Sequence, residues 1–169
     1  RGRMLRRRLI EEREEEADDL ALKTLRHFRG IRNRVDGILG RHMERQTSVS
    51  ETKAYPFETS DMLPPIETGN MTKILEAAYR RVSKRTFGAV NDVGVAGTLN
   101  WSDKLPTVQK VLAQAPVRAA MIHRTTSKAI GRAVGIGLER GYSIEQLAQG
   151  VPDDKFPGIR SLLTETENR

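Results

Sequence analysis

The stretch ERGYSIEQLAQGV, residues 139–151, decides how the C-terminal part of the chain folds. Ser143 is followed three residues later by Gln146, which is the spacing of a capping box at a helix N-terminus. Gly150 stands where such a short helix would end, because glycine readily adopts the left-handed conformation that closes many helices. The stretch therefore predicts a short, capped helix between two turns.

A short helix of this kind is also compatible with the first half of a DNA-reading helix-turn-helix motif. The second helix of that motif would have to begin near Pro152, where the sequence reads VPDDKFPGIR. Two aspartates at its start would face phosphates, and Pro157 would break the helix. The sequence therefore argues against sequence-specific DNA recognition by this segment.

A longer helix is expected before this stretch, over residues 117–140. Its apolar side chains recur on one broad side at 100° per residue: Ile122, Ala129, Ile130, Ala133, Val134, Ile136 and Leu138. Numerous Ala and Gly residues make the helix narrow, so that a neighbour can approach closely. This small-residue side predicts packing in a multimer, with an intramolecular partner helix near residues 70–87 as the alternative.

The same helix carries a basic stripe. Arg124, Lys128 and Arg132 follow one another at four-residue spacing, and Arg118 lies beside them. Residues 80–140 hold eleven Lys or Arg against three Asp or Glu, a net charge of +8. We interpret these four side chains as candidate contacts to DNA phosphates or to an acidic partner, with a solvated helix face as the alternative.

The N-terminal part predicts an arm and a connection. Residues 4–43 repeat apolar side chains every three to four positions, which indicates one long amphipathic helix or two in line. Its arginine- and glutamate-rich beginning is typical of a solvated arm or a coiled-coil end, and an arginine-rich nucleic-acid arm is the alternative. Residues 46–69, with three prolines, predict a linker or an extended wrap.

The middle of the chain predicts further helices. One is expected from a cap at Asn70 to about Phe87, followed by a loop or a short strand pair in the glycine-containing residues 88–101. Pro106 can begin the next helix, and Pro116 interrupts or kinks it. We expect a mainly α, elongated protein with a helical arm (1–45), a linker or wrap (46–69) and a helical domain (70–169) that is cut short at its C-terminus.

Composition limits the function classes. Of the 169 residues 37% are hydrophobic and 5% aromatic, and the mean hydropathy of −0.53 predicts a thin core. Without cysteine the chain has no disulfide framework and no Cys-based metal cluster. No apolar run reaches the length that crosses a bilayer, so we expect no membrane contact.

No catalytic, cofactor or metal site is predicted. His27, His42 and His123 lack a further ligand at metal spacing. The glycine-containing segments lack the Gly-Lys-Ser/Thr ending of a phosphate loop, and Ser143 has no base near it in sequence. We therefore expect a protein that is not an enzyme.

The segment HRTTSKAIGRAVGIGLERGYSIEQLAQGVPDDKFPGIRSLLTETENR, residues 123–169, resembles the Mu F-type head morphogenesis family, the minor head proteins of tailed bacteriophages. Within these 47 residues the resemblance lies in Thr125, Thr126, Gly137, Gly141, Ser143, Leu147, Ala148 and Phe156. The Arg-Thr-Glu that ends the family pattern does not appear, so the most specific part of the motif is missing.

This resemblance implies a structural virion component in the head interior or at the portal vertex, assembled in the host cytoplasm. Such a minor capsid protein acts in head assembly and in DNA packaging or ejection, as a multimer with portal or capsid proteins as partners. Because the chain begins without Met, we expect a part of a longer polypeptide, and an extension of a portal protein is conceivable. The residues alone leave a second interpretation open, a helical protein that binds nucleic acid, including packaged DNA, without sequence preference.

Overall fold

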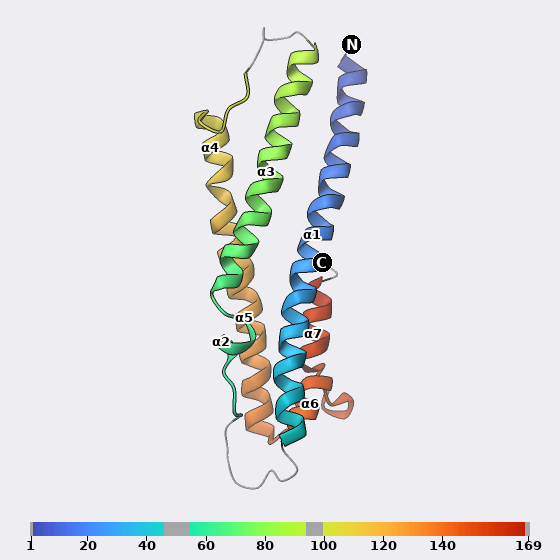
Figure 1. The fold of residues 1–169 in the computed structure, drawn as a ribbon. Helices are drawn as coiled ribbons and strands as arrows, with labels where there is room; N and C mark the ends of the chain where they lie inside the picture. The colour runs from blue at the N-terminus through green and yellow to red at the C-terminus, as the bar shows by residue number, and fades with distance from the viewer. Residues whose placement is uncertain (1, 46–54, 94–99, 168–169) are drawn as a thin grey trace. The chain divides into compact units, whose positions relative to one another are not determined.

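The computed structural model describes residues 2–45, 55–93 and 100–167. The described residues form α-helices and one short 3-10 helix, and their only β-structure is an isolated bridge between Val151 and Phe156. The prediction of a mainly α protein is confirmed. No described helix combines the length and the apolar character that crossing a membrane requires. In chain order the helices (Figure 1) are α1 (Gly2–Arg45), α2 (Thr59–Met62), α3 (Ile66–Val93), α4 (Pro106–Leu112), α5 (Gln114–Arg140), α6 (Ile144–Gln149), η1 (Pro152–Asp154) and α7 (Gly158–Glu167).

The chain divides into two compact units, and the long helices α1, α3 and α5 contribute residues to both. Unit 1 consists of residues 1–24 and 68–120, and unit 2 of residues 25–67 and 121–169. Each unit therefore combines residues from before residue 45 with residues from after residue 70, the two boundaries that the sequence predicts.

The N-terminal sequence folds as a single helix, the first of the two expected alternatives. In the part of α1 that belongs to unit 2, buried side chains recur every three to four residues, which is the spacing of one helix face. They are Phe28, Ile31, Val35, Ile38 and Leu39.

The helix α3 extends beyond its predicted ends. It begins at Ile66, so the predicted cap at Asn70 is wrong. Pro64 and Pro65 precede the first helical residue, and the Glu67 amide donates to the Pro64 carbonyl, which sets the start. At the other end, residues 88–93 are helical and not a loop or strand pair, because burial of Ala89 offsets the low helix propensity of Gly88. Residues 94–99 of the expected loop lie outside the described residues.

Two proline predictions are confirmed. Pro106 is the first residue of α4, where its missing amide proton costs no helical hydrogen bond. The helix ends at Leu112, four residues before Pro116, and α5 starts again at Gln114. Pro116 therefore lies in the first turn of α5, where proline is tolerated.

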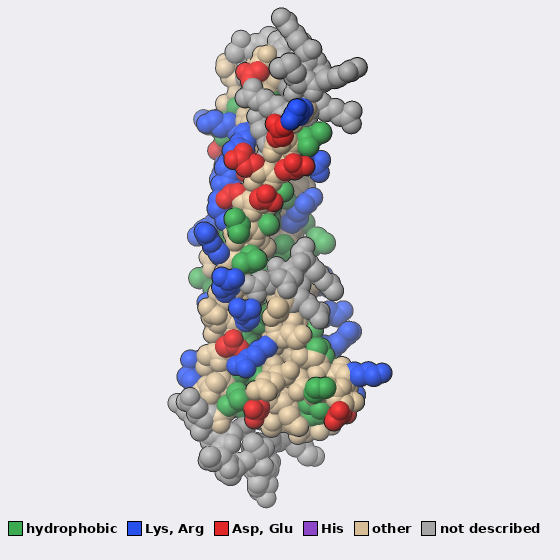
Figure 2. All heavy atoms as spheres, turned by 90° about the vertical axis from the view of Figure 1, so that its right-hand side faces the viewer, with side chains coloured by type: hydrophobic (Ala, Val, Ile, Leu, Met, Phe, Trp, Pro, Cys, Tyr) green, Lys and Arg blue, Asp and Glu red, His purple; other side chains and the backbone are tan. Residues whose placement is uncertain are grey.

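Ion pairs connect α1 and α3 in unit 1. Glu16, almost fully buried, accepts from Arg81 Nε at 3.0 Å and lies 3.2 Å from Arg85 Nη1. Arg81 also pairs with Asp19, and Arg85 with Glu15. Acidic residues at the start of the chain thus neutralise arginines of α3, which favours a packed helix over a nucleic-acid arm. Figure 2 shows acidic and basic side chains interleaved on the face that carries α1.

The described end of the segment 46–69 is packed in unit 2. The Tyr55 ring stacks on Phe57 with centroids 5.4 Å apart, and Phe57, Met62 and Leu63 are buried. Thr59 Oγ1 lies 3.7 Å from the point where a Cβ at Gly131 of α5 would stand. Residues 55–63 therefore pack against α5, but Thr59–Met62 is helical and residues 66–69 belong to α3, so these parts are not an extended wrap. Residues 46–54 lie outside the described part.

The quoted stretch folds as predicted. Ser143 caps α6: its hydroxyl accepts from the Gln146 amide, and the Gln146 side chain accepts from the Ser143 amide. Gly150 ends the helix with φ of 95°, and the amide of Val151 then donates to the Phe156 carbonyl. The turn after α6 is thereby closed into a tight loop that leads to α7.

The backbones at the two ends of that loop touch. A Cβ on Gly158, the first residue of α7, would stand 2.4 Å from the Gly150 nitrogen, and one on Gly150 would stand 2.4 Å from the Phe156 carbonyl oxygen. Both glycines also have positive φ. Only glycine satisfies the space and the backbone conformation at these positions.

Replacing Gly158 by alanine should therefore destabilise unit 2 more than the same change at Gly141. Gly141 also has positive φ but nothing within 4 Å of its would-be Cβ, so Gly141→Ala should cost only the conformational strain, about 1–2 kcal/mol. Gly158→Ala adds an overpacking cost of about 1–3 kcal/mol. Urea denaturation of both variants measures the difference, and equal losses would show that the Gly150–Gly158 contact is not tight.

Candidate functional site

The basic stripe of α5 is exposed in unit 2. Arg124, Lys128 and Arg132 are all solvent-exposed, and none forms an ion pair with a described residue. Their four-residue spacing places them on successive turns of one helix face. These three cations, which have no partner among the described residues, remain available to an external anion.

Arg118 has a different environment. Its guanidinium carbon lies 5.9 Å from the centre of the Tyr79 ring of α3, within the range of a cation–π interaction. Both residues belong to unit 1. Of the four predicted basic residues, Arg118 is thus the one whose charge already has an intramolecular contact.

Most other arginines of residues 80–140 are already engaged. Arg81 and Arg85 pair with acids of α1, Arg80 lies 3.4 Å from Asp103 Oδ2, and Arg140 lies 3.6 Å from Asp154 Oδ2. The charge excess of this region is therefore partly neutralised within the fold. In unit 2, the part of this charge excess that is not neutralised is the stripe on α5.

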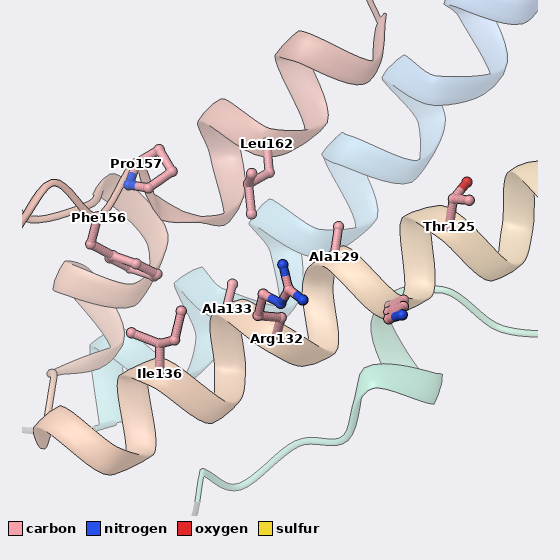
Figure 3. Close-up of a pocket in the computed structure, with 9 residues that line it drawn as sticks. Thr125, Ala129, Arg132, Ala133, Ile136, Phe156, Pro157 and Leu162 are labelled. Atoms are coloured by element: carbon pink, nitrogen blue, oxygen red, sulfur yellow. The ribbon is translucent and has the colours of Figure 1, made fainter.

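A groove runs beside this stripe, between α5 and the segment that contains the start of α7 (Figure 3). Its volume is about 470 Å³, within the usual range for a binding site. The lining residues are Thr125, Lys128, Ala129, Arg132, Ala133, Ile136, Phe156, Pro157 and Leu162. The lining is mostly apolar, and its two charged residues are both basic.

Sequence reasoning found one wall of this groove and missed the other. The α5 residues were expected as an apolar side and a basic stripe, but Pro157 and Leu162 carried no signal of their own. They reach the groove because the loop closed by Gly150 and Gly158 turns α7 back beside α5. The tight loop could be foreseen only in part, since no local signal in the sequence shows that two glycines eight residues apart touch.

One apolar position on α5 was predicted wrongly. Leu138 is 42% exposed, whereas Ile130 and Ala133 are buried. At 100° per residue, Leu138 lies about 100° around the helix from the buried Gly137 and about 140° from the buried Ala133. The buried side of α5 is therefore narrower at its C-terminal end than the sequence indicated.

The matched residues of the C-terminal motif, Gly137, Gly141, Ser143, Leu147, Ala148 and Phe156, all have structural roles. Leu147, Ala148 and Phe156 are buried, Ser143 caps α6, and Gly141 has φ of 67°. The two threonines of the motif lie earlier in α5: Thr126 is buried, and the Thr125 hydroxyl donates to the Met121 carbonyl. The motif thus fixes the backbone path from α5 to α7.

Gly137 is the most crowded of these positions. A Cβ there would stand 2.6 Å from the Tyr55 hydroxyl and 2.9 Å from Leu147 Cδ1. The same hydroxyl donates to the Tyr142 carbonyl at 2.8 Å, and burial raises the pKa of Tyr55. At Gly137, therefore, three segments of unit 2 come together: the segment with Tyr55, α5 itself, and the segment with Tyr142 and Leu147.

Gly137→Ala should destabilise unit 2 by about 1–3 kcal/mol, because the added methyl displaces Tyr55 or Leu147. Gly135 is the matched control on the same helix, with nothing within 4 Å of its would-be Cβ. There alanine should stabilise by roughly 0.5–1 kcal/mol through helix propensity. The two changes are compared by chemical denaturation, and a stabilising Gly137→Ala would mean that the contact with Tyr55 is loose.

A buried charge cluster lies elsewhere in unit 2. The Glu67 carboxylate is only 6% exposed, pairs with Arg34, and lies 3.6 Å from His27 Nδ1. Burial lowers the pKa of His27, Glu67 opposes this effect, and Arg34 adds to it. Within the described ranges no group of three or more His, Cys, Asp or Glu side chains is arranged to hold a metal ion.

The lowered pKa of His27 predicts a loss of stability in acid. The unfolded histidine takes up a proton near pH 6.5 and the folded one only at lower pH, so protonation favours the unfolded chain. The free energy of unfolding should therefore fall as the pH drops below 6.5 through the folded pKa. His27→Gln should flatten this part of the stability profile, measured by denaturation at stepped pH. An unchanged slope would assign the acid sensitivity to other groups.

Neither a protein-family model nor a curated protein nor a solved structure matches this chain.

Proposed function

We propose that this chain is a structural assembly protein, a minor head component of a tailed bacteriophage that acts near the portal in head assembly and in DNA packaging or ejection. The observation that carries the proposal is the resemblance of residues 123–169 to the Mu F-type family, together with the roles of the matched residues. Each acts through backbone geometry, capping or packing. A motif of this kind is what a shared scaffold, rather than a shared reaction, requires.

The proposal makes portal or capsid proteins the partners and a multimer the working form. It places the chain in the virion, either as a separate protein or as an extension of a portal protein. The exposed stripe of α5 supports a role in contacts, because three cations there have no partner among the described residues. No catalytic step is part of the proposal.

Electron microscopy of the chain co-expressed with the portal protein from the same source tests this role. We expect added density on the portal ring, in the same position on every subunit. A control with Gly158→Ala, which disturbs the backbone contact between Gly150 and the start of α7, should lose this density while the ring itself persists. A portal ring without added density at saturating amounts of the wild-type chain would contradict the proposal.

The second candidate is nonspecific nucleic-acid binding by the stripe, since exposed Arg and Lys side chains reach phosphates without reading bases. Replacing Arg124, Lys128 and Arg132 by alanine should then flatten the slope of log K against log salt by roughly two to three units. The matched control removes the same charge elsewhere, at the exposed Lys84, Lys104 and Lys110. Duplex binding is measured by salt titration. If the slope flattens equally for both triple variants, or if the wild type shows no binding at low salt, this stripe does not contact phosphates.

A further inference from the structure

The groove beside α5 combines two features that a DNA backbone would not use together. Its lining is mostly apolar, and Ala129, Ile136 and Leu162 keep part of their surface open to solvent. Its charged residues, Lys128 and Arg132, are both basic and both unpaired with described residues. Phosphates would engage the cations alone and leave the apolar floor in water.

The open apolar floor favours a partner that brings its own apolar side chains. Burying apolar surface is the main favourable term in most protein association, whereas exposed ion pairs contribute little on their own. In Figure 3, Ala129, Ala133 and Ile136 project from α5 toward the side where Phe156 and Leu162 lie. An occupant of the groove would therefore contact α5 and the segment 156–162 at once.

The dimensions of the groove fit a helix. Its lining along α5 runs from Thr125 to Ile136, which is about 16 Å at the helical rise per residue. Ala129 and Ala133, one turn apart, allow the backbone of an incoming helix to approach within the usual interaxial distance of roughly 8–10 Å. A helix laid along α5 would present apolar residues to the floor at intervals of three or four.

Charge sets the remaining chemistry of the occupant. Lys128 and Arg132 are separated by one helical turn, as are residues i and i+4 of a partner helix. Since none of the described residues that line the groove is acidic, two carboxylates on successive turns of the partner would meet both cations without a competing acid from this lining. An acidic amphipathic helix is complementary to the groove in shape, polarity and charge.

We propose that this groove binds an amphipathic helical segment of a partner protein, with apolar residues in the groove and Asp or Glu facing Lys128 and Arg132. The proposal goes beyond the assembly role and does not depend on it, because it concerns only the groove residues of unit 2.

Selection from a displayed library of 16-residue helical peptides, randomised at eight positions, tests the proposal with the whole chain as target. The wild-type chain is the bait, and the Lys128→Glu/Arg132→Glu variant removes peptides that do not need the cations. We expect the surviving peptides to carry an apolar stripe flanked by carboxylates one turn apart. A selection that yields no peptides, or peptides without carboxylates, would overturn the proposal.

The best peptide is then synthesised with a fluorophore and titrated by polarisation against four chains. The double charge reversal should weaken binding by at least about tenfold, and a peptide with its acids changed to Lys should bind that variant better than the wild type. Ala129→Phe, which fills the groove, should also abolish binding. Arg124→Glu, the matched control outside the groove lining, should change the affinity by less than about threefold.

Two further outcomes decide the assignment. Each variant must keep the circular dichroism melt of the wild type, and Ala129→Phe and the charge reversal provide independent routes if one fails to fold. If Arg124→Glu weakens the peptide as much as the double reversal, binding is to the stripe and not to the groove. If a 20-base-pair duplex displaces the peptide at physiological salt from the wild type but not from Arg124→Glu, nucleic acid is the ligand and the proposal is wrong.

Discussion

The structure of unit 2 depends on the place where α5 has no side chain. A Cβ at Gly137 would stand 2.6 Å from the Tyr55 hydroxyl and 2.9 Å from Leu147 Cδ1, so any larger residue there would have to displace these side chains. Tyr55 donates to the carbonyl of Tyr142, which holds the wrap segment against the turn that leads into α6. A second backbone contact, between Gly150 and Gly158, then directs α7 back beside α5. The groove beside the basic stripe exists because these two contacts fix the path of the chain.

Packing within each unit also determines which charged side chains are already paired. Glu16 is buried between Arg81 and Arg85, and Asp36 accepts from Arg160 at 2.6 Å, so several arginines act as intramolecular partners. The net charge of a segment therefore overstates the charge that a ligand meets. Lys128 and Arg132 stand out because they combine exposure, a shared helix face and an apolar groove. This combination, more than the overall excess of basic residues, indicates where unit 2 would meet a partner.

Local signals in the sequence predicted local structure. The capping box at Ser143, the end of α6 at Gly150 and the start of α4 at Pro106 depend on neighbouring residues, and all three are confirmed. The start of α3 was missed because Pro64 and Pro65 compete with Asn70 as a boundary, and only the observed hydrogen bond from Glu67 decides between them. The far wall of the groove could not be predicted, since it requires residues 150 and 158 to touch. The stripe on α5 could be predicted, because it follows from helical periodicity alone.

We infer that the chain from α5 through α6 to α7 forms one rigid scaffold, held by close contacts at its glycines. Native-state hydrogen exchange tests it most directly. The amides of Val151 and Phe156, which donate across the bridge, should exchange with the same opening free energy as the amides of Ile130 and Ala133 in the buried part of α5. Exchange of the bridge amides by local opening, at least about a hundredfold faster while α5 stays protected, would contradict a single scaffold.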